Sequence, residues 1–125
     1  MSSARERALD GVKAGDMIFG MGAGGQEKLL LVYKVDRDNI FTRHVTTQVK
    51  LKFDRSGKTG PAPGGGHCTI VSVAPLPPEE HAVAIGLDRK MRTGKEYPDF
   101  VLTKEEIQLI LTKGDFYKAR PLPND

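Results

Sequence analysis

The stretch at residues 40–53, IFTRHVTTQVKLKF, alternates in polarity with a period of two. Side chains of a β-strand point in turn to its two faces, so this pattern predicts one half-buried strand. Fourteen residues exceed the usual strand length, and we therefore expect a bulge or bend near Arg43 or Thr46. One predicted face carries Phe41, Val45, Val49, Leu51 and Phe53, and the other carries His44, Thr46, Gln48, Lys50 and Lys52.

Further strand patterns flank this stretch. Residues 17–19 begin a strand after a Gly-Asp turn, and the apolar run at 29–35 is typical of a central strand that is covered on both faces. The glycine-rich segment 20–25 predicts a hairpin loop, because a dinucleotide-binding loop would be followed by a helix. Residues 68–74 and 116–120 are predicted to be the last two strands.

Helices are predicted in the second half of the chain. Thr103 and Glu106 have the spacing of a capping box, and Leu102 with Ile107 has that of a hydrophobic staple. The buried stripe of this helix is predicted to consist of Ile107, Ile110 and Leu111. The segment 79–91 has helix-type termini, with a strand at 82–87 as the alternative.

Together these patterns predict one α+β domain spanning residues 1–125. The expected core is a small, strongly bent antiparallel sheet or SH3-like β-barrel, with one or two late helices. Residues 1–14 are expected to form a frayed tail or short helix, and the Gly/Pro-rich segment 54–67 a mobile loop. Internal repeats are absent from the sequence.

Composition excludes few functions. The chain has a net charge of +3, one cysteine, and no N-terminal apolar run of the signal-peptide type. Its longest uninterrupted apolar stretch, 29–33, is too short to cross a bilayer, so a cytoplasmic location without membrane contact is expected by default. His and Cys residues do not fall at metal-ligand spacing, and neither a cofactor nor a catalytic motif is predicted.

Basic residues are concentrated between positions 43 and 58, where Asp54 is the one acid. A twisted strand that carries cations could follow a phosphate backbone. The candidate anion-binding residues are Arg43, His44, Lys50, Lys52, Arg55 and Lys58. A solvated strand face, with lysines protecting an exposed edge, is the alternative, because the predicted face lacks aromatic residues for stacking.

Arg43 has the parity of Phe41 and Val45, so an unbroken strand would turn it inward. A buried arginine needs an acidic partner or a ligand anion. A bulge that turns Arg43 outward is the alternative.

The residues VKAGDMI at 12–18, followed by a loop and LLLV at 29–32, resemble the opening of SH3-like barrels and of the PemK-type toxin barrels. The toxins of that family are ribonucleases, so the resemblance implies a small hydrolase. It assigns no catalytic residue to a position of this chain.

Three hypotheses of function follow. A non-enzymatic cytosolic binding module would contact nucleic acid or an acidic protein through its basic strand face. A small enzyme such as a ribonuclease would use His44 as base and Arg43 to stabilise charge. A structural or assembly protein would meet another chain through a strand edge or its proline segments. Of these, the binding module is favoured; oligomeric state is left open.

Overall fold

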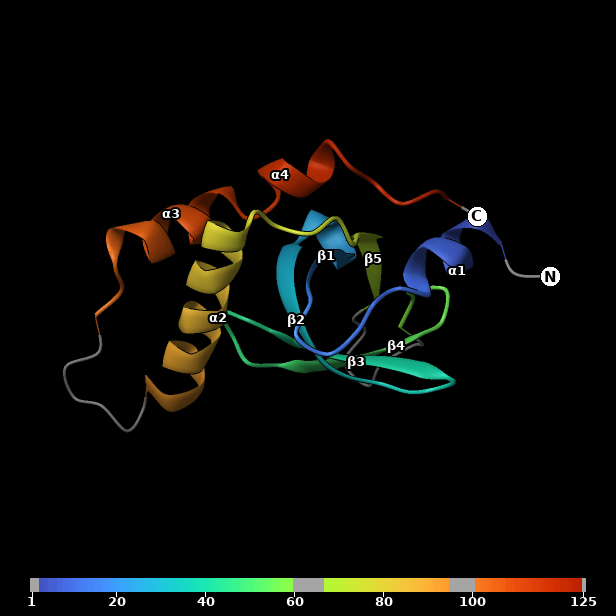
Figure 1. Ribbon diagram of the computed structural model, residues 1–125, viewed down its shortest axis with the longest axis horizontal. Coiled ribbons are helices and arrows are strands. Elements are labelled where there is room, and N and C mark those ends of the chain that lie inside the picture. The colour runs from blue at the N-terminus through green and yellow to red at the C-terminus, as the bar shows by residue number, and fades with distance from the viewer. Residues whose placement is uncertain (1–2, 60–66, 95–100, 125) are drawn as a thin grey trace.

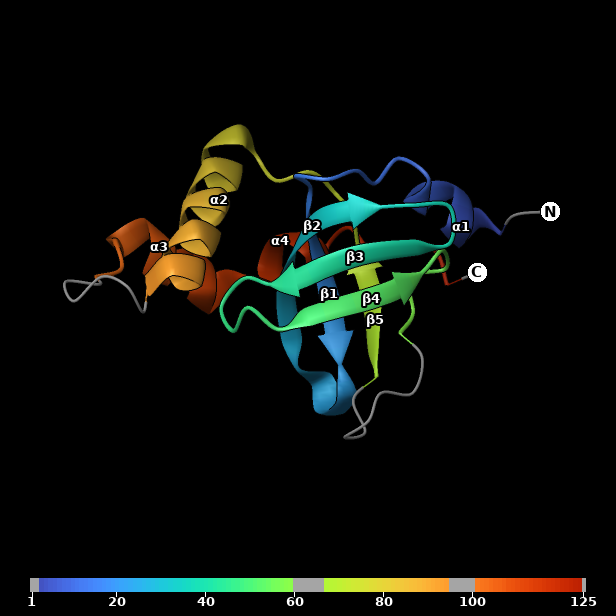
Figure 2. The same cartoon turned by 90° about the horizontal axis from the view of Figure 1, so that it is seen from below.

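The computed structural model describes residues 3–59, 67–94 and 101–124. Its centre is an antiparallel sheet in the order β4-β3-β2-β1-β5, curled strongly into a half-barrel. Figures 1 and 2 show β3 and β4 crossing the direction of β1 and β5, as this curl requires. The strands are β1 (Met17–Gly22), β2 (Glu27–Val35), β3 (Asn39–His44), β4 (Lys50–Asp54) and β5 (Cys68–Ser72).

In the part of the chain that the structure describes, four α-helices accompany the sheet, and Figure 1 shows α2 (Pro78–Thr93) and α3 (Lys104–Thr112) beside each other at one end of it, with α1 (Ala4–Leu9) at the other end. Residues 79–91 lie within the longest of these helices. The predicted helix is therefore confirmed, and the alternative of a strand at 82–87 is wrong. The predicted α+β fold with a small bent sheet and late helices is confirmed. The helices are α1 (Ala4–Leu9), α2 (Pro78–Thr93), α3 (Lys104–Thr112) and α4 (Asp115–Lys118), with a 3₁₀ turn η1 (Ala23–Gly25) between β1 and β2.

Each face of the sheet has its own apolar core. On the inner face of the curl, Leu9 and Val12 pack with Ile18, Leu30 and neighbouring side chains. The outer face is packed by the late helices along β1 and the first half of β2. That second cluster contains Met17, Phe19, Leu29, Leu31, Val45, Leu76, Ala84, Leu87, Leu109 and Tyr117.

The single long strand predicted at 40–53 is wrong, because the chain reverses at 45–49 and forms the β3–β4 hairpin. The amide of Gln48 donates to the carbonyl of His44, and Gln48 adopts a left-handed φ of 62°. This reversal changes which positions point inward. Phe41 lies opposite Lys52, whereas Phe53 lies opposite Ile40 on the other face of the sheet.

The strand predicted at 116–120 is also wrong. Its first residues belong to α4, because burial of Tyr117 holds a helical turn against the sheet. The Tyr117 ring stacks on Phe19 with centroids 5.5 Å apart, and its hydroxyl donates to the carbonyl of Met17.

The capping box of α3 is confirmed, since Thr103 and Glu106 exchange both hydrogen bonds. Its predicted buried stripe is partly wrong. Ile107 and Leu111 are 46% and 75% exposed, whereas Leu109 is buried. Glu106 pairs with Lys90 of α2 and thereby turns a different side of α3 toward the core.

Two expectations about segments have partial outcomes. Residues 60–66 of the predicted mobile loop lie outside the described residues. The helix predicted as one option for residues 1–14 is α1. Among the described helices, none combines the length and apolar character needed to cross a bilayer.

Candidate anion-binding face

A β-bulge in β2 brings an aromatic ring and a cation to the same face. The β2–β3 register shifts between Val32 and Lys34, so that Lys34 pairs with Phe41 and Tyr33 is the extra residue. Because one residue is added at a bulge, neighbours that would otherwise alternate can both point outward. Tyr33 and Lys34 therefore both reach the surface that Phe41 occupies.

The hairpin completes this surface. In β3–β4, Phe41 lies opposite Lys52 and Arg43 lies opposite Lys50. The rings of Tyr33 and Phe41 are 6.2 Å apart between centroids, with an interplanar angle of 47°. We call this surface the aromatic–basic face; it consists of Tyr33, Lys34, Phe41, Arg43, Lys50 and Lys52.

Cations lie close to both rings. Lys34 Nζ is 5.0 Å from the Phe41 centroid, and Lys50 Nζ is 5.7 Å from that of Tyr33. The guanidinium of Arg43 is 5.8 Å from the Tyr33 centroid. Each contact is within the range of a cation–π interaction. The positive charges are thus collected around the aromatic pair.

Arg43 is held by α2. Its Nε and Nη2 donate to the two carboxylate oxygens of Asp88 at 2.9 and 2.8 Å, and Gln48 Nε2 donates to the same carboxylate. Burial alone would raise the pKa of Asp88, but the hydrogen bonds from Arg43 and Gln48 and the charge of Arg92 hold it below its ordinary value. The acidic-partner alternative for Arg43 is therefore the correct one.

The three lysines of the face form no close ion pair of this kind, although backbone hydrogen bonds from Asp38 and Asn39, with the charges of Lys34 and Arg55, lower the pKa of Asp36. Of the ion pairs formed within residues 3–59, 67–94 and 101–124, none involves Lys34, Lys50 or Lys52, and all three side chains are exposed. The nearest acid on β4, Asp54, is turned into the next loop, where it accepts hydrogen bonds from Ser56. In Figure 2 no helix lies in front of β3 and β4.

The other predicted candidates do not join this face. His44 is buried on the opposite side of the sheet from Arg43, and both ring nitrogens contact threonine hydroxyls, those of Thr46 and Thr47. Burial, with the charges of Lys28 and Lys113, lowers the pKa of His44 to about 4. A base at His44 and a charge-stabilising group at Arg43 would therefore face opposite sides of the sheet and not one substrate.

Arg55 and Lys58 lie beyond the end of β4. Arg55 is 3.6 Å from a carboxylate oxygen of Asp10, and Lys58 forms an isolated bridge with Thr69 of β5. The sequence cluster at 43–58 is thus divided: Arg43, Lys50 and Lys52 come together, while its remaining members occupy other parts of the molecule.

Tyr33 and Phe41 are the residues of this face that sequence reasoning missed. Both are half-buried. The alternation at 40–53 predicts Phe41 on the face opposite Lys50 and Lys52, and the apolar run at 29–35 predicts Tyr33 in a strand that is covered on both faces. The available signal was the Tyr-Lys pair at the end of the apolar run, where a polar residue breaks its continuity.

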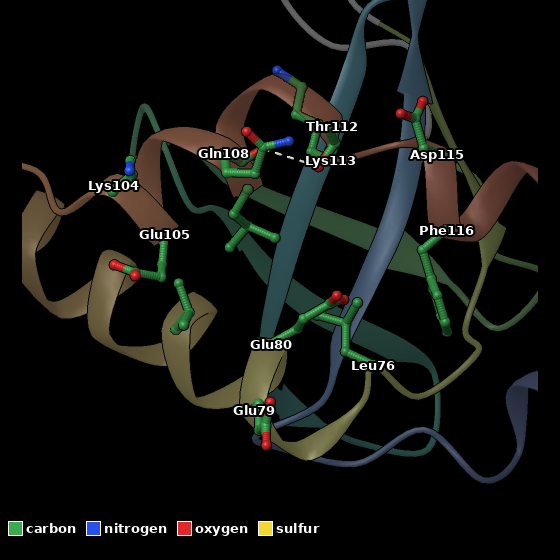
Figure 3. A pocket seen from close by; sticks show the side chains of 12 residues that line it. Leu76, Glu79, Glu80, Lys104, Glu105, Gln108, Thr112, Lys113, Asp115 and Phe116 are labelled. Carbon is green, nitrogen blue, oxygen red and sulfur yellow. Dashed lines mark hydrogen bonds between the residues drawn. The ribbon is translucent and has the colours of Figure 1, made fainter.

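A groove lies on another side of the molecule. This groove, of about 620 Å³, runs between the start of α2, α3 and α4, with Leu76, Leu109 and Phe116 among its apolar lining (Figure 3). Four carboxylates and two lysines also line it: Glu79, Glu80, Glu105 and Asp115 with Lys104 and Lys113. Its excess of negative charge opposes binding of a polyanion, so the groove is not an extension of the aromatic–basic face.

Other site chemistry is limited. Among the described residues, no group of three His, Cys, Asp or Glu side chains could hold a metal ion. Cys68 is buried, and burial raises the pKa of its thiol, which disfavours the nucleophilic thiolate.

No protein-family model matches the chain, and neither a curated protein nor a solved structure is significantly similar to it.

Proposed function

We propose that this protein is a non-enzymatic nucleic-acid-binding module that uses the aromatic–basic face. The observation that carries the proposal is the presence, around two rings on an uncovered part of the sheet, of three exposed lysines that form no ion pair within the described residues. Cations placed in this way displace the counterions that surround a phosphate backbone, and this release drives binding.

The spacing of the lysines fits a linear polyanion. Lys50 and Lys52 are two residues apart on β4, which corresponds to about 7 Å along the strand, and both project to the same side. Lys34 extends the charge across β3 to β2. A chain of phosphates lying across the strands would contact cations from β2 and β4 in turn. Arg43 is neutralised and held in place by Asp88, so it lines this path without adding a free charge.

Charge reversal tests this proposal. Lys50→Glu with Lys52→Glu removes two phosphate contacts, and binding of a fluorescein-labelled 16-nucleotide strand is measured by anisotropy at several salt concentrations. For a single strand, the slope of log K against log salt should decrease in magnitude by about 1.4, since each contact contributes about 0.7. Circular dichroism confirms that the variant is folded.

The matched control reverses Lys104 and Lys113, both on the groove side of the molecule (Figure 3), with the same change in net charge. The control should retain the wild-type slope. The proposal would be refuted if the Lys50/Lys52 variant bound the strand as tightly as the wild type, or if the control lost as much affinity as that variant. Failure of the wild type to bind the strand at low salt would also refute it.

A further inference from the structure

Building on the proposed function, we infer that the nucleic acid is single-stranded and that two of its bases stack on Tyr33 and Phe41. Both rings belong to the surface that carries the lysines, and both are half-buried, so each has a fixed position and an accessible part. Base–aromatic stacking tolerates any sequence because every base has a π-face.

The geometry of the pair favours separate bases. The two centroids are 6.2 Å apart and the ring planes are inclined by 47°, so the rings do not stack on one another. Each ring can therefore accept its own base. In a duplex both faces of an internal base are covered by its neighbours, and such a base is not available for stacking on a side chain. This arrangement therefore selects unpaired strands.

The neighbouring cations complete the site. Lys34 is next to the Phe41 ring and Lys50 is next to the Tyr33 ring, and both lysines are exposed on long flexible side chains. When a base occupies a ring, the adjacent lysine can move to the phosphate of that nucleotide. Arg43 cannot move in this way, because two hydrogen bonds hold it to Asp88. Each ring with its lysine thus forms a subsite for one nucleotide.

The test separates stacking from charge. Tyr33→Leu with Phe41→Leu retains apolar bulk but removes both π-faces, and Tyr33→Phe with native Phe41 is the conservative control. Four probes are used: ten-nucleotide oligo(dT), ten-nucleotide oligo(U), a ten-base-pair DNA duplex, and heparin, which has negative charge but no bases. The two single strands distinguish DNA from RNA as the preferred source of the bases.

The wild type should bind at least one single strand more tightly than the duplex. The double leucine variant should lose about tenfold or more in affinity per ring for that strand, with heparin affinity unchanged, and Tyr33→Phe should bind like the wild type. Tighter binding of the duplex, an unchanged single-strand affinity in the leucine variant, or an equal loss for heparin would overturn the inference. Binding of the single strand or the duplex that still depends on Lys50 and Lys52 would leave the proposed function standing in each of those cases.

Discussion

Replacing His44 by glutamine should remove a defined part of the dependence of stability on pH. The imidazole has a pKa of about 4 in the folded protein and an ordinary value of 6.5 in the unfolded chain, because burial and the charges of Lys28 and Lys113 disfavour the cation. Between these values the unfolded state binds more protons, so the free energy of unfolding decreases as the pH falls. From about pH 7 to about pH 5 the two pKa values give a loss of about 2 kcal/mol.

Urea denaturation followed by circular dichroism, at about pH 7, 6 and 5, measures this contribution. Glutamine keeps polar contact with the Thr46 and Thr47 hydroxyls but does not titrate. Carboxylates that titrate in the same range contribute to both proteins and cancel in the difference. The wild-type curve should therefore fall more steeply than that of His44→Gln, by about 2 kcal/mol over the interval. Parallel curves would show that the folded imidazole titrates normally and would refute its burial in a neutral form.

Two further substitutions test how the face and the sheet are supported. Asp88→Asn leaves the guanidinium of Arg43 without its carboxylate partner. Breaking a fully buried ion pair typically costs about 3–5 kcal/mol, and because Arg43 is partly exposed we expect the free energy of unfolding to fall by about 3 kcal/mol or less. A shift of Tm close to zero would contradict the pairing. Gly20→Ala places a Cβ 2.9 Å from Leu30 Cδ1 and 3.1 Å from Cys68 Sγ, so overpacking should lower the free energy of unfolding by about 1–3 kcal/mol in urea titrations. A neutral Gly20→Ala variant would mean that β1 and β5 pack less closely.

Local signals predicted the parts of the fold that depend on neighbouring residues. The capping box at Thr103 needs only residues within one turn, and it is present as predicted. The hairpin at 45–49 was missed because Thr46 and Gln48 continue the polarity alternation of the strands. The turn also lacks glycine, and Gln48 supplies the left-handed residue in its place. The polarity pattern at 40–53 therefore does not distinguish the β3–β4 hairpin from one continuous strand.

The sequence predicts some of the basic residues of the candidate site, but not its two aromatic residues. The sequence places Lys50 and Lys52 on one face, because two residues at strand spacing share a side whatever the register. The partner of Arg43 is 45 positions away on a helix, and sequence periodicity carries no information on such a contact. Tyr33 has the parity of Leu31, which lies opposite Arg43, but Lys34 joins the same face only through a bulge that depends on pairing with β3.

The most direct test of the aromatic–basic face is a titration of ¹⁵N-labelled protein with ten-nucleotide oligo(dT) and oligo(U), followed by amide chemical shifts. The account predicts that the largest changes occur at residues of β2, β3 and β4 around Tyr33, Phe41 and Lys50, for at least one strand, and that they decrease with added salt. Changes centred on the groove residues Leu109 and Phe116, or no changes with either strand at low salt, would contradict it.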